Sequence, residues 1–164
     1  RKCKKNILKN NFVLLPPYKA NNMILFHIHD AQLVISNRRA IKKWIQGIIE
    51  SHDKRTGDIN IIFCRSDYLL ELNKKYLEHD YYTDVITFPY SEEKKVSGDI
   101  FIDVDTVACN AETFRQSFGN ELLRVMIHGV LHLLGLDDNN EENAHIMRKA
   151  EDTALTKITV DPVQ

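Results

Sequence analysis

Long apolar runs and paired cysteines are both missing from this sequence, and each absence excludes a class of protein. No apolar run approaches the roughly 20 residues that a bilayer-spanning helix needs, so no membrane protein is predicted. The three cysteines, Cys3, Cys64 and Cys109, are widely spaced and odd in number, which excludes a disulfide framework and a C-x-x-C metal pair. We expect Cys64 and Cys109 to be buried small side chains in a protein of the reducing cytoplasm.

Acidic side chains are missing from residues 1–22, which carry six basic ones. The rest of the chain therefore has 16 basic residues against 23 acidic ones, a net charge of −7. Sequence-blind binding of nucleic acid usually needs a basic surface, so this acidic part argues against it. A polyanionic partner would have to be held by a local patch or by a metal ion.

The basic residues 1–22 are predicted to be an N-terminal extension outside the folded part. They lack the long apolar stretch and small-residue cleavage site of a secretory signal. They could form an interaction arm or targeting peptide, but we favour Met23 as the natural start, because it opens the first strand-like run. Residues 23–164 have the length of one compact domain.

Hydrophobic periodicity predicts strands and helices that alternate after Met23. Alternating or β-branched runs predict strands at 23–29, 58–64, 84–88 and 98–104. Apolar residues at helical spacing predict helices from Ser36 or Asn37 to 50, and at 66–77, 106–118, 121–134 and 141–155. The last two strands are expected to pair as a hairpin, and Gly119 to separate the third helix from the fourth. This order predicts an α/β fold in which a small mixed β-sheet is packed with helices.

Two histidines, His128 and His132, stand four residues apart in the predicted fourth helix. That separation is about 40° around a helix axis and about 6 Å along it, so both imidazoles can reach one ion. The rest of this helix is strongly apolar, and desolvated histidines need partners. Gly129, between them, weakens the helix, which indicates that another part of the chain approaches the backbone there.

The turn after this helix offers a third metal ligand. Gly135 ends the helix three residues beyond His132, and Asp137 and Asp138 follow on a turn that can fold back. Two imidazoles and a carboxylate make three ligands and leave one position open, as a catalytic zinc site requires. A buried histidine pair that is hydrogen-bonded to backbone or carboxylates is the alternative interpretation.

The same residues carry a resemblance to a known family. Residues 128–138, H-G-V-L-H-L-L-G-L-D-D, resemble the H-G-x-L-H-L-x-G-x-D-H signature of the YbeY family, metal-dependent endoribonucleases of bacterial ribosomal RNA maturation. Residues 72–89, L-N-K-K-Y-L-E-H-D-Y-Y-T-D-V-I-T-F-P, resemble its L-N-x-x-[YF]-R-x-K-D-x-P-T-D-V-L-S-F-P motif. Gly98-Asp99-Ile100 keeps the family's order, and the similarity runs from about Met23 to Leu155.

The resemblance implies a zinc-dependent single-strand endoribonuclease in which residues 23–164 form one metallo-hydrolase domain. It implies one Zn²⁺ per chain, with other divalent transition metals as alternatives, and His128, His132 and Asp138 as ligands. The implied partners are precursors of ribosomal RNA and ribosomal particles, in the cytoplasm and without a membrane. A non-catalytic, metal-stabilised ribosome-assembly factor is the alternative function.

Three positions depart from the family's pattern. Asp138 stands where the family has its third histidine; a carboxylate also binds zinc, but it lowers the charge of the site and makes bound water a weaker acid. Leu77 replaces an arginine that the family uses on RNA, so that phosphate contact is lost. His79 replaces a lysine, and three roles are open to it: it supplies part of the lost positive charge, it acts as a catalytic residue in proton transfer or as a metal ligand, or it is a solvated loop histidine.

Other residues are weaker candidates. Thr83 and Asp84 open a strand and are expected either to orient the metal ligands or to cap a turn. Four basic residues share one helix face, which either contacts RNA or is only solvated: Arg38, Arg39, Lys42 and Lys43. A zinc peptidase is the third hypothesis, but peptidases of the H-E-x-x-H type carry their catalytic glutamate where this chain has Gly129.

Overall fold

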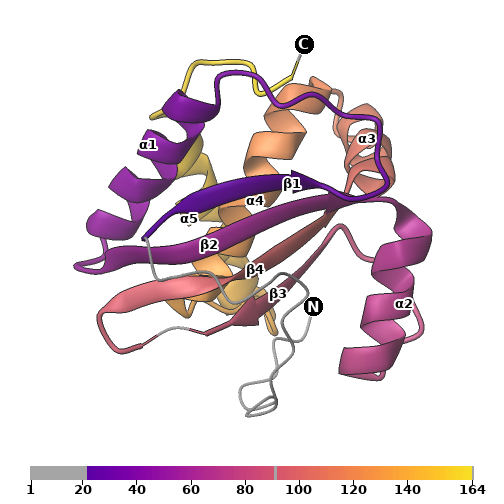
Figure 1. Ribbon diagram of the computed structural model, residues 1–164, viewed down its shortest axis with the longest axis horizontal. Helices are drawn as coiled ribbons and strands as arrows, with labels where there is room; N and C mark the ends of the chain where they lie inside the picture. Colours follow the sequence, from indigo (N-terminus) through magenta and orange to yellow (C-terminus); the bar gives the residue numbers. More distant parts are fainter. Residues whose placement is uncertain (1–21, 91, 164) are drawn as a thin grey trace.

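The architecture is a four-stranded mixed sheet with helices on both faces (Figure 1). The computed structural model describes residues 22–90 and 92–163. The strands, in the sheet order β1-β2-β4-β3, are β1 (Ile24–Ile28), β2 (Arg55–Cys64), β4 (Lys95–Asp103) and β3 (Val85–Pro89). β1, β2 and β4 are parallel, and β3 pairs antiparallel with β4. The α/β class, the mixed sheet and the predicted hairpin are confirmed.

The two faces of the sheet carry different cores. The helices of the described residues are α1 (Arg38–Glu50), α2 (Ser66–Leu77), α3 (Val104–Thr113), α4 (Phe118–Leu134) and α5 (Glu141–Leu155). Ile59, Ile61 and Phe63 of β2 face the larger core, to which α1, α4 and α5 contribute. Ile62 and Cys64 alternate with them and face a smaller core under α2.

Helix α4 lies unusually close to β4, because glycines stand at two points of contact. A Cβ added to Gly129 would lie 2.6 Å from Cγ2 of Ile100, and one added to Gly98 would lie 2.6 Å from Cδ2 of Leu133. The close approach that Gly129 predicted is therefore confirmed, and its partner is the central part of the sheet.

One helix boundary was predicted wrongly. Helix α3 ends at Thr113, and Ser117 caps α4 by accepting a hydrogen bond from the Asn120 backbone (3.1 Å), so Gly119 lies inside α4 instead of separating two helices. A Cβ on Gly119 would lie 2.5 Å from Oδ1 of Asp161, so this glycine serves packing against the C-terminal segment.

Smaller differences concern strand length and cysteine burial. β2 begins at Arg55 rather than Asp58, because Arg55 and Thr56 already pair with β4. The register of this pairing shifts between Thr56 and Ile59. Cys64 is buried as expected, but Cys109 is exposed on α3. Cys3 and the rest of the predicted extension, up to residue 21, lie outside the described residues. Among the helices described, none combines the length and the apolar character that a bilayer crossing requires.

Candidate metal centre

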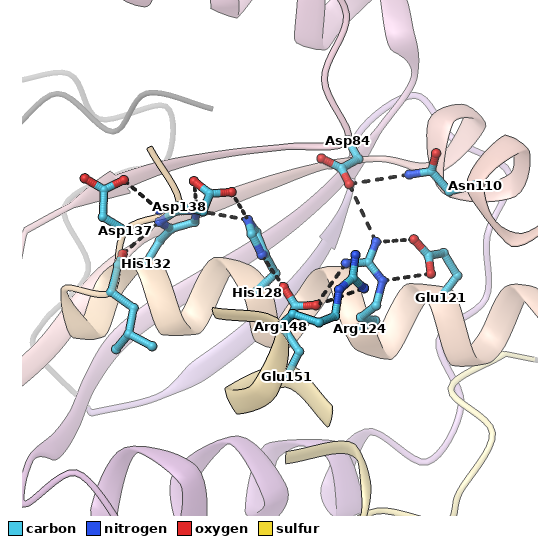
Figure 2. Close-up of polar contacts among 11 residues, drawn as sticks. Asp84, Asn110, Glu121, Arg124, His128, His132, Asp137, Asp138, Arg148 and Glu151 are labelled. Atoms are coloured by element: carbon cyan, nitrogen blue, oxygen red, sulfur yellow. Dashed lines mark hydrogen bonds and ion pairs between the residues drawn. The ribbon is translucent and has the colours of Figure 1, made fainter. Parts of the chain in front are cut away.

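Three side chains from α4 and the turn that follows it converge on one point (Figure 2). Nε2 of His128 lies 2.9 Å from Nε2 of His132. The carboxylate of Asp138 lies 3.8 Å from the first nitrogen and 3.7 Å from the second. The three side chains are only 2%, 7% and 9% exposed. The predicted cluster of His128, His132 and Asp138 is therefore present in the fold.

Each imidazole is held from behind through its other nitrogen. Nδ1 of His128 is 2.5 Å from Oε1 of Glu151 on α5, and Nδ1 of His132 is 3.0 Å from the carbonyl oxygen of Leu136. Both partners are acceptors, so each Nδ1 carries the proton and each Nε2 presents its lone pair to the other. This is the arrangement by which proteins fix metal-binding histidines.

A left-handed turn brings the carboxylate to the histidines. Gly135 ends α4 with φ +102°, and its N–H lies within hydrogen-bonding reach of the last-turn carbonyls. Glycine adopts this conformation without the strain of a Cβ. Oδ1 of Asp137 then accepts a hydrogen bond from the Asp138 backbone (2.8 Å), so Asp137 shapes the turn while Asp138 faces the histidines.

These residues fit a transition metal such as zinc. With the proton of each ring on Nδ1, two Nε2 atoms 2.9 Å apart would repel each other, and a cation bound by both would remove that repulsion. Two ligands held at 2.0–2.1 Å by one tetrahedral zinc ion lie about 3.3 Å apart, between the separations found here. Imidazole with carboxylate is a donor set that suits zinc and several related ions.

A buried network of charges supports the His128 side of the cluster (Figure 2). Arg124 forms a two-pronged ion pair with Glu121 and donates to Oε2 of Glu151 (3.2 Å). Oδ2 of Asp84 lies 3.9 Å from the same guanidinium. Arg148 lies 3.4 Å from Glu151 and is 54% exposed, whereas the other four side chains are at most 5% exposed. A buried arginine thus balances three carboxylates next to a candidate ligand.

The charges of this network shift two pKa values. Burial raises the pKa of Glu151, but the hydrogen bond from His128 and the charges of Arg124 and Arg148 outweigh burial and leave it lowered. Burial lowers the pKa of Arg124, and its bonds to Glu121 and Glu151 more than reverse this. Glu151 is therefore an anion, and its Oε1 accepts a hydrogen bond from the Nδ1–H of His128.

The remaining predicted site residues lie at different distances from the cluster. Asp84 is connected to His128 through Arg124 and Glu151. The hydroxyl of Thr83 donates a hydrogen bond to the backbone carbonyl of Val85 (3.4 Å), which is a contact within the local turn. His79 is absent from the cluster of ligand atoms found in the described residues, and its ring contacts Tyr81 instead.

The predicted basic face lies on α1, which packs against β2, whereas α4 packs against β3 and β4. Arg38 donates to the carbonyl of Ile35 (3.0 Å), and the ammonium of Lys42 lies 5.7 Å from the Phe26 ring centre. Arg39 and Lys43 are exposed. The RNA-binding role of Arg38, Arg39, Lys42 and Lys43 stays a prediction.

Glu151, Arg124 and Glu121 were not predicted from the sequence. Glu121 and Arg124 are charged residues three apart in an otherwise apolar helix, which is a signal for a buried ion pair. Glu151 is four residues after Met147 and three before Ala154, both of which are buried. This helical spacing could have predicted that Glu151 lies on the inner face of α5. Its pairing with His128, 23 residues away, could not be predicted in this way.

Comparison with known proteins identifies the family. The family described as endoribonuclease YbeY matches residues 26–159. The chain belongs to the YbeY family. The endoribonuclease YbeY of Parabacteroides distasonis is 47% identical over 132 residues, which cover 80% of this chain and 93% of that protein. That of Phocaeicola vulgatus is 44% identical and is matched over its whole length and 84% of this chain.

A solved structure also matches the fold. The solution structure of the Thermotoga maritima protein TM1509 has a TM-score of 0.57 and 30% sequence identity, and the match covers 82% of this chain and 88% of that one. The YbeY relatives are named endoribonucleases, so membership of the family makes the chain an enzyme of the hydrolytic nuclease class.

Proposed function

We propose that this YbeY protein is a metal-dependent endoribonuclease that cuts single-stranded parts of ribosomal RNA precursors, in ribosomal particles and in the cytoplasm. The observation that carries the proposal is the convergence of His128, His132 and Asp138, with each imidazole fixed through Nδ1. The ribosomal substrate and its compartment follow from the family resemblance. The single domain from Met23 to the C-terminus is part of the same proposal.

We assign one zinc ion to the three ligands. Zinc bound there supplies a Lewis acid for a phosphoryl oxygen and raises the acidity of an attacking water. The chain itself holds the proton of His128 on Nδ1 through Glu151 and that of His132 through the Leu136 carbonyl. Asp138 gives the ligand set one negative charge, which a third histidine would not.

A zinc peptidase and a non-catalytic ribosome-assembly factor are the two alternative functions. The glutamate of an H-E-x-x-H peptidase has no room, since even a Cβ at Gly129 meets Ile100 at 2.6 Å. The ribosome-assembly factor is favoured by Leu77, which packs against the smaller core and offers no phosphate contact. It predicts that metal is bound and RNA is not cut.

The test is cleavage of a labelled single-stranded RNA by the purified full chain. We expect slow cleavage, about one zinc per chain by elemental analysis, and loss of both on chelation. His132→Ala should lose metal and cleavage, whereas His145→Ala, which changes an exposed histidine of α5, should keep them. Metal binding with no cleavage would favour the assembly factor, and cleavage that survives in His132→Ala would disprove the assignment of the site.

A further inference from the structure

The loop between α2 and β3 exposes an unusual amount of aromatic surface. Tyr81 is 47% exposed and Tyr82 is 58% exposed. His79 lies beside them on the same loop, with its ring stacked on that of Tyr81. Large exposed aromatic groups that lie together in one loop indicate a binding surface more often than single ones do.

This loop is held in one conformation from below. The buried Asn73 of α2 accepts a hydrogen bond from the His79 backbone at its carbonyl (3.2 Å) and donates its amide to the carbonyl of Tyr81 (2.7 Å). Asn73 is 1% exposed. Lys74 and Asp80 add an ion pair at 2.8 Å. The backbone that carries His79 and Tyr81 is therefore held in place by hydrogen bonds to a buried residue of α2.

Two of the rings already form a stack. The centres of the His79 and Tyr81 rings are 5.1 Å apart, and their planes differ by 24°. Nδ1 of His79 and the hydroxyl of Tyr81 are 3.1 Å apart, within hydrogen-bonding distance. A flat group of similar size, such as a nucleobase, can continue such a stack.

The loop and the candidate metal centre share one chain of contacts. Tyr82 precedes the buried Asp84 by two residues, and Asp84 lies 3.9 Å from Arg124. Arg124 contacts Glu151, and Glu151 contacts His128 (Figure 2). The aromatic loop thus leads along the chain directly into Asp84, the outermost carboxylate of the buried network behind His128.

The charge of this region favours stacking over phosphate binding. The loop itself carries Glu78 and Asp80 and no lysine or arginine. Of the two lysines in the last turn of α2, Lys74 is paired with Asp80, and the ammonium of Lys75 lies 5.1 Å from the centre of the Tyr76 ring. Phosphate contacts need lysine or arginine side chains. Stacking on an aromatic ring does not, and it is open to all four nucleobases because each has a flat π-face. An acidic chain that acts on single-stranded RNA can take its affinity from the bases.

We propose that His79, Tyr81 and Tyr82 form a stacking platform for the bases of single-stranded RNA, on the loop that leads into Asp84 of the network behind His128. This proposal rests on the proposed endoribonuclease function. It gives His79 a binding role, and it makes the substrate of this chain an unpaired strand recognised by its bases rather than by its phosphates.

The experiment measures binding of a fluorescent single-stranded 2′-O-methyl oligonucleotide to the zinc-loaded full chain, with the integrity of the probe checked on a gel. Tyr81→Leu and Tyr82→Leu should each weaken binding roughly tenfold. Tyr82→Phe should bind like the natural chain, because it keeps the ring. Phe114→Leu, which removes an exposed aromatic group from the end of α3, is the matched control and should have no effect.

Two further comparisons separate stacking from charge. The loss in Tyr82→Leu should be nearly the same at low and high salt, and an abasic oligonucleotide of equal length should bind the natural chain no better than it binds Tyr82→Leu. Equal affinity of the natural chain and both leucine variants, or tight binding of the abasic strand, would overturn the platform. In that case zinc-dependent cleavage by the natural chain would still stand, whereas absence of both cleavage and binding would also overturn the proposed function.

Discussion

The two histidines of the candidate centre are one helical turn apart, yet they are held in opposite ways. His128 rests on Glu151, a side chain that a buried arginine and an exposed arginine hold in place. His132 rests on the Leu136 carbonyl, which a glycine turn brings into position. One ligand thus depends on tertiary ion pairs and the other on local backbone geometry. Changes to side chains should damage the first, and changes to backbone conformation the second.

The largest effect should come from the histidines themselves. His128→Ala and His132→Ala should each abolish zinc binding, because two remaining ligands hold zinc poorly. Elemental analysis of protein purified without chelator measures this, and full occupancy in either variant would contradict the ligand assignment.

The metal-free forms of these two variants should differ. His128→Ala removes a buried hydrogen-bond partner of Glu151 and should lower the free energy of unfolding by about 1–3 kcal/mol. His132→Ala removes only the hydrogen bond to the backbone carbonyl of Leu136, so it should lower the free energy of unfolding by less. Urea unfolding of both variants in chelator tests this order.

Arg124 should matter most for folding. Arg124→Met leaves Glu121 and Glu151 buried without their shared cation, so we expect a loss of about 3–5 kcal/mol in the free energy of unfolding. Arg148→Met, at the exposed end of the same network, should change it by less than about 1 kcal/mol. Equal losses in the two variants would show that burial does not set the strength of this network.

The carboxylate behind His128 should set metal affinity. Glu151→Gln keeps an acceptor oxygen but removes the charge, so zinc affinity should fall about 10-fold or more. Leu136→Ala leaves the carbonyl behind His132 in place and should keep the affinity of the natural chain. Competition with a chromogenic chelator measures both, and an unchanged affinity in Glu151→Gln would mean that the two supports are equivalent.

The smallest effect should come from the turn. Gly135→Ala has free space for its Cβ, but its φ of +102° strains an alanine, so we expect a loss of about 1–2 kcal/mol and weaker zinc binding. Gly47→Ala in α1 also meets no atom and lacks that strain, so it should stabilise the fold by about 0.5–1 kcal/mol. Thermal unfolding of the two variants compares them directly.

The sequence could predict what depends on neighbours along the chain. The spacing of His128 and His132, the glycine stop and the acidic turn predicted the cluster, and alternating runs predicted the strands of the sheet. Predictions were wrong where a distant contact decides. Gly119 looked like a helix break, but its missing side chain accommodates Asp161.

The supports of the site show the same limit. Glu151 reaches His128 only because α5 folds back against α4, and no spacing in the sequence encodes that pairing. Asp84 was expected either to orient the ligands or to cap a turn, and the structure connects it to His128 through Arg124 and Glu151. Its role in metal binding remains a prediction that the Arg124 variants can probe.

The two glycine contacts between α4 and β4 have a consequence for where the site can be damaged. Gly129 meets Ile100, and Gly98 meets Leu133, so the helix and the strand are interlocked at two points one turn apart. These two contacts prevent α4 from sliding along β4 or rotating about its own axis. The positions of the two histidines of the candidate centre are therefore set by the packing of the hydrophobic core. Shortening Ile100 to alanine, which removes the Cγ2 atom that meets Gly129, would loosen the interlock, and the metal centre would then fail through a residue of the sheet.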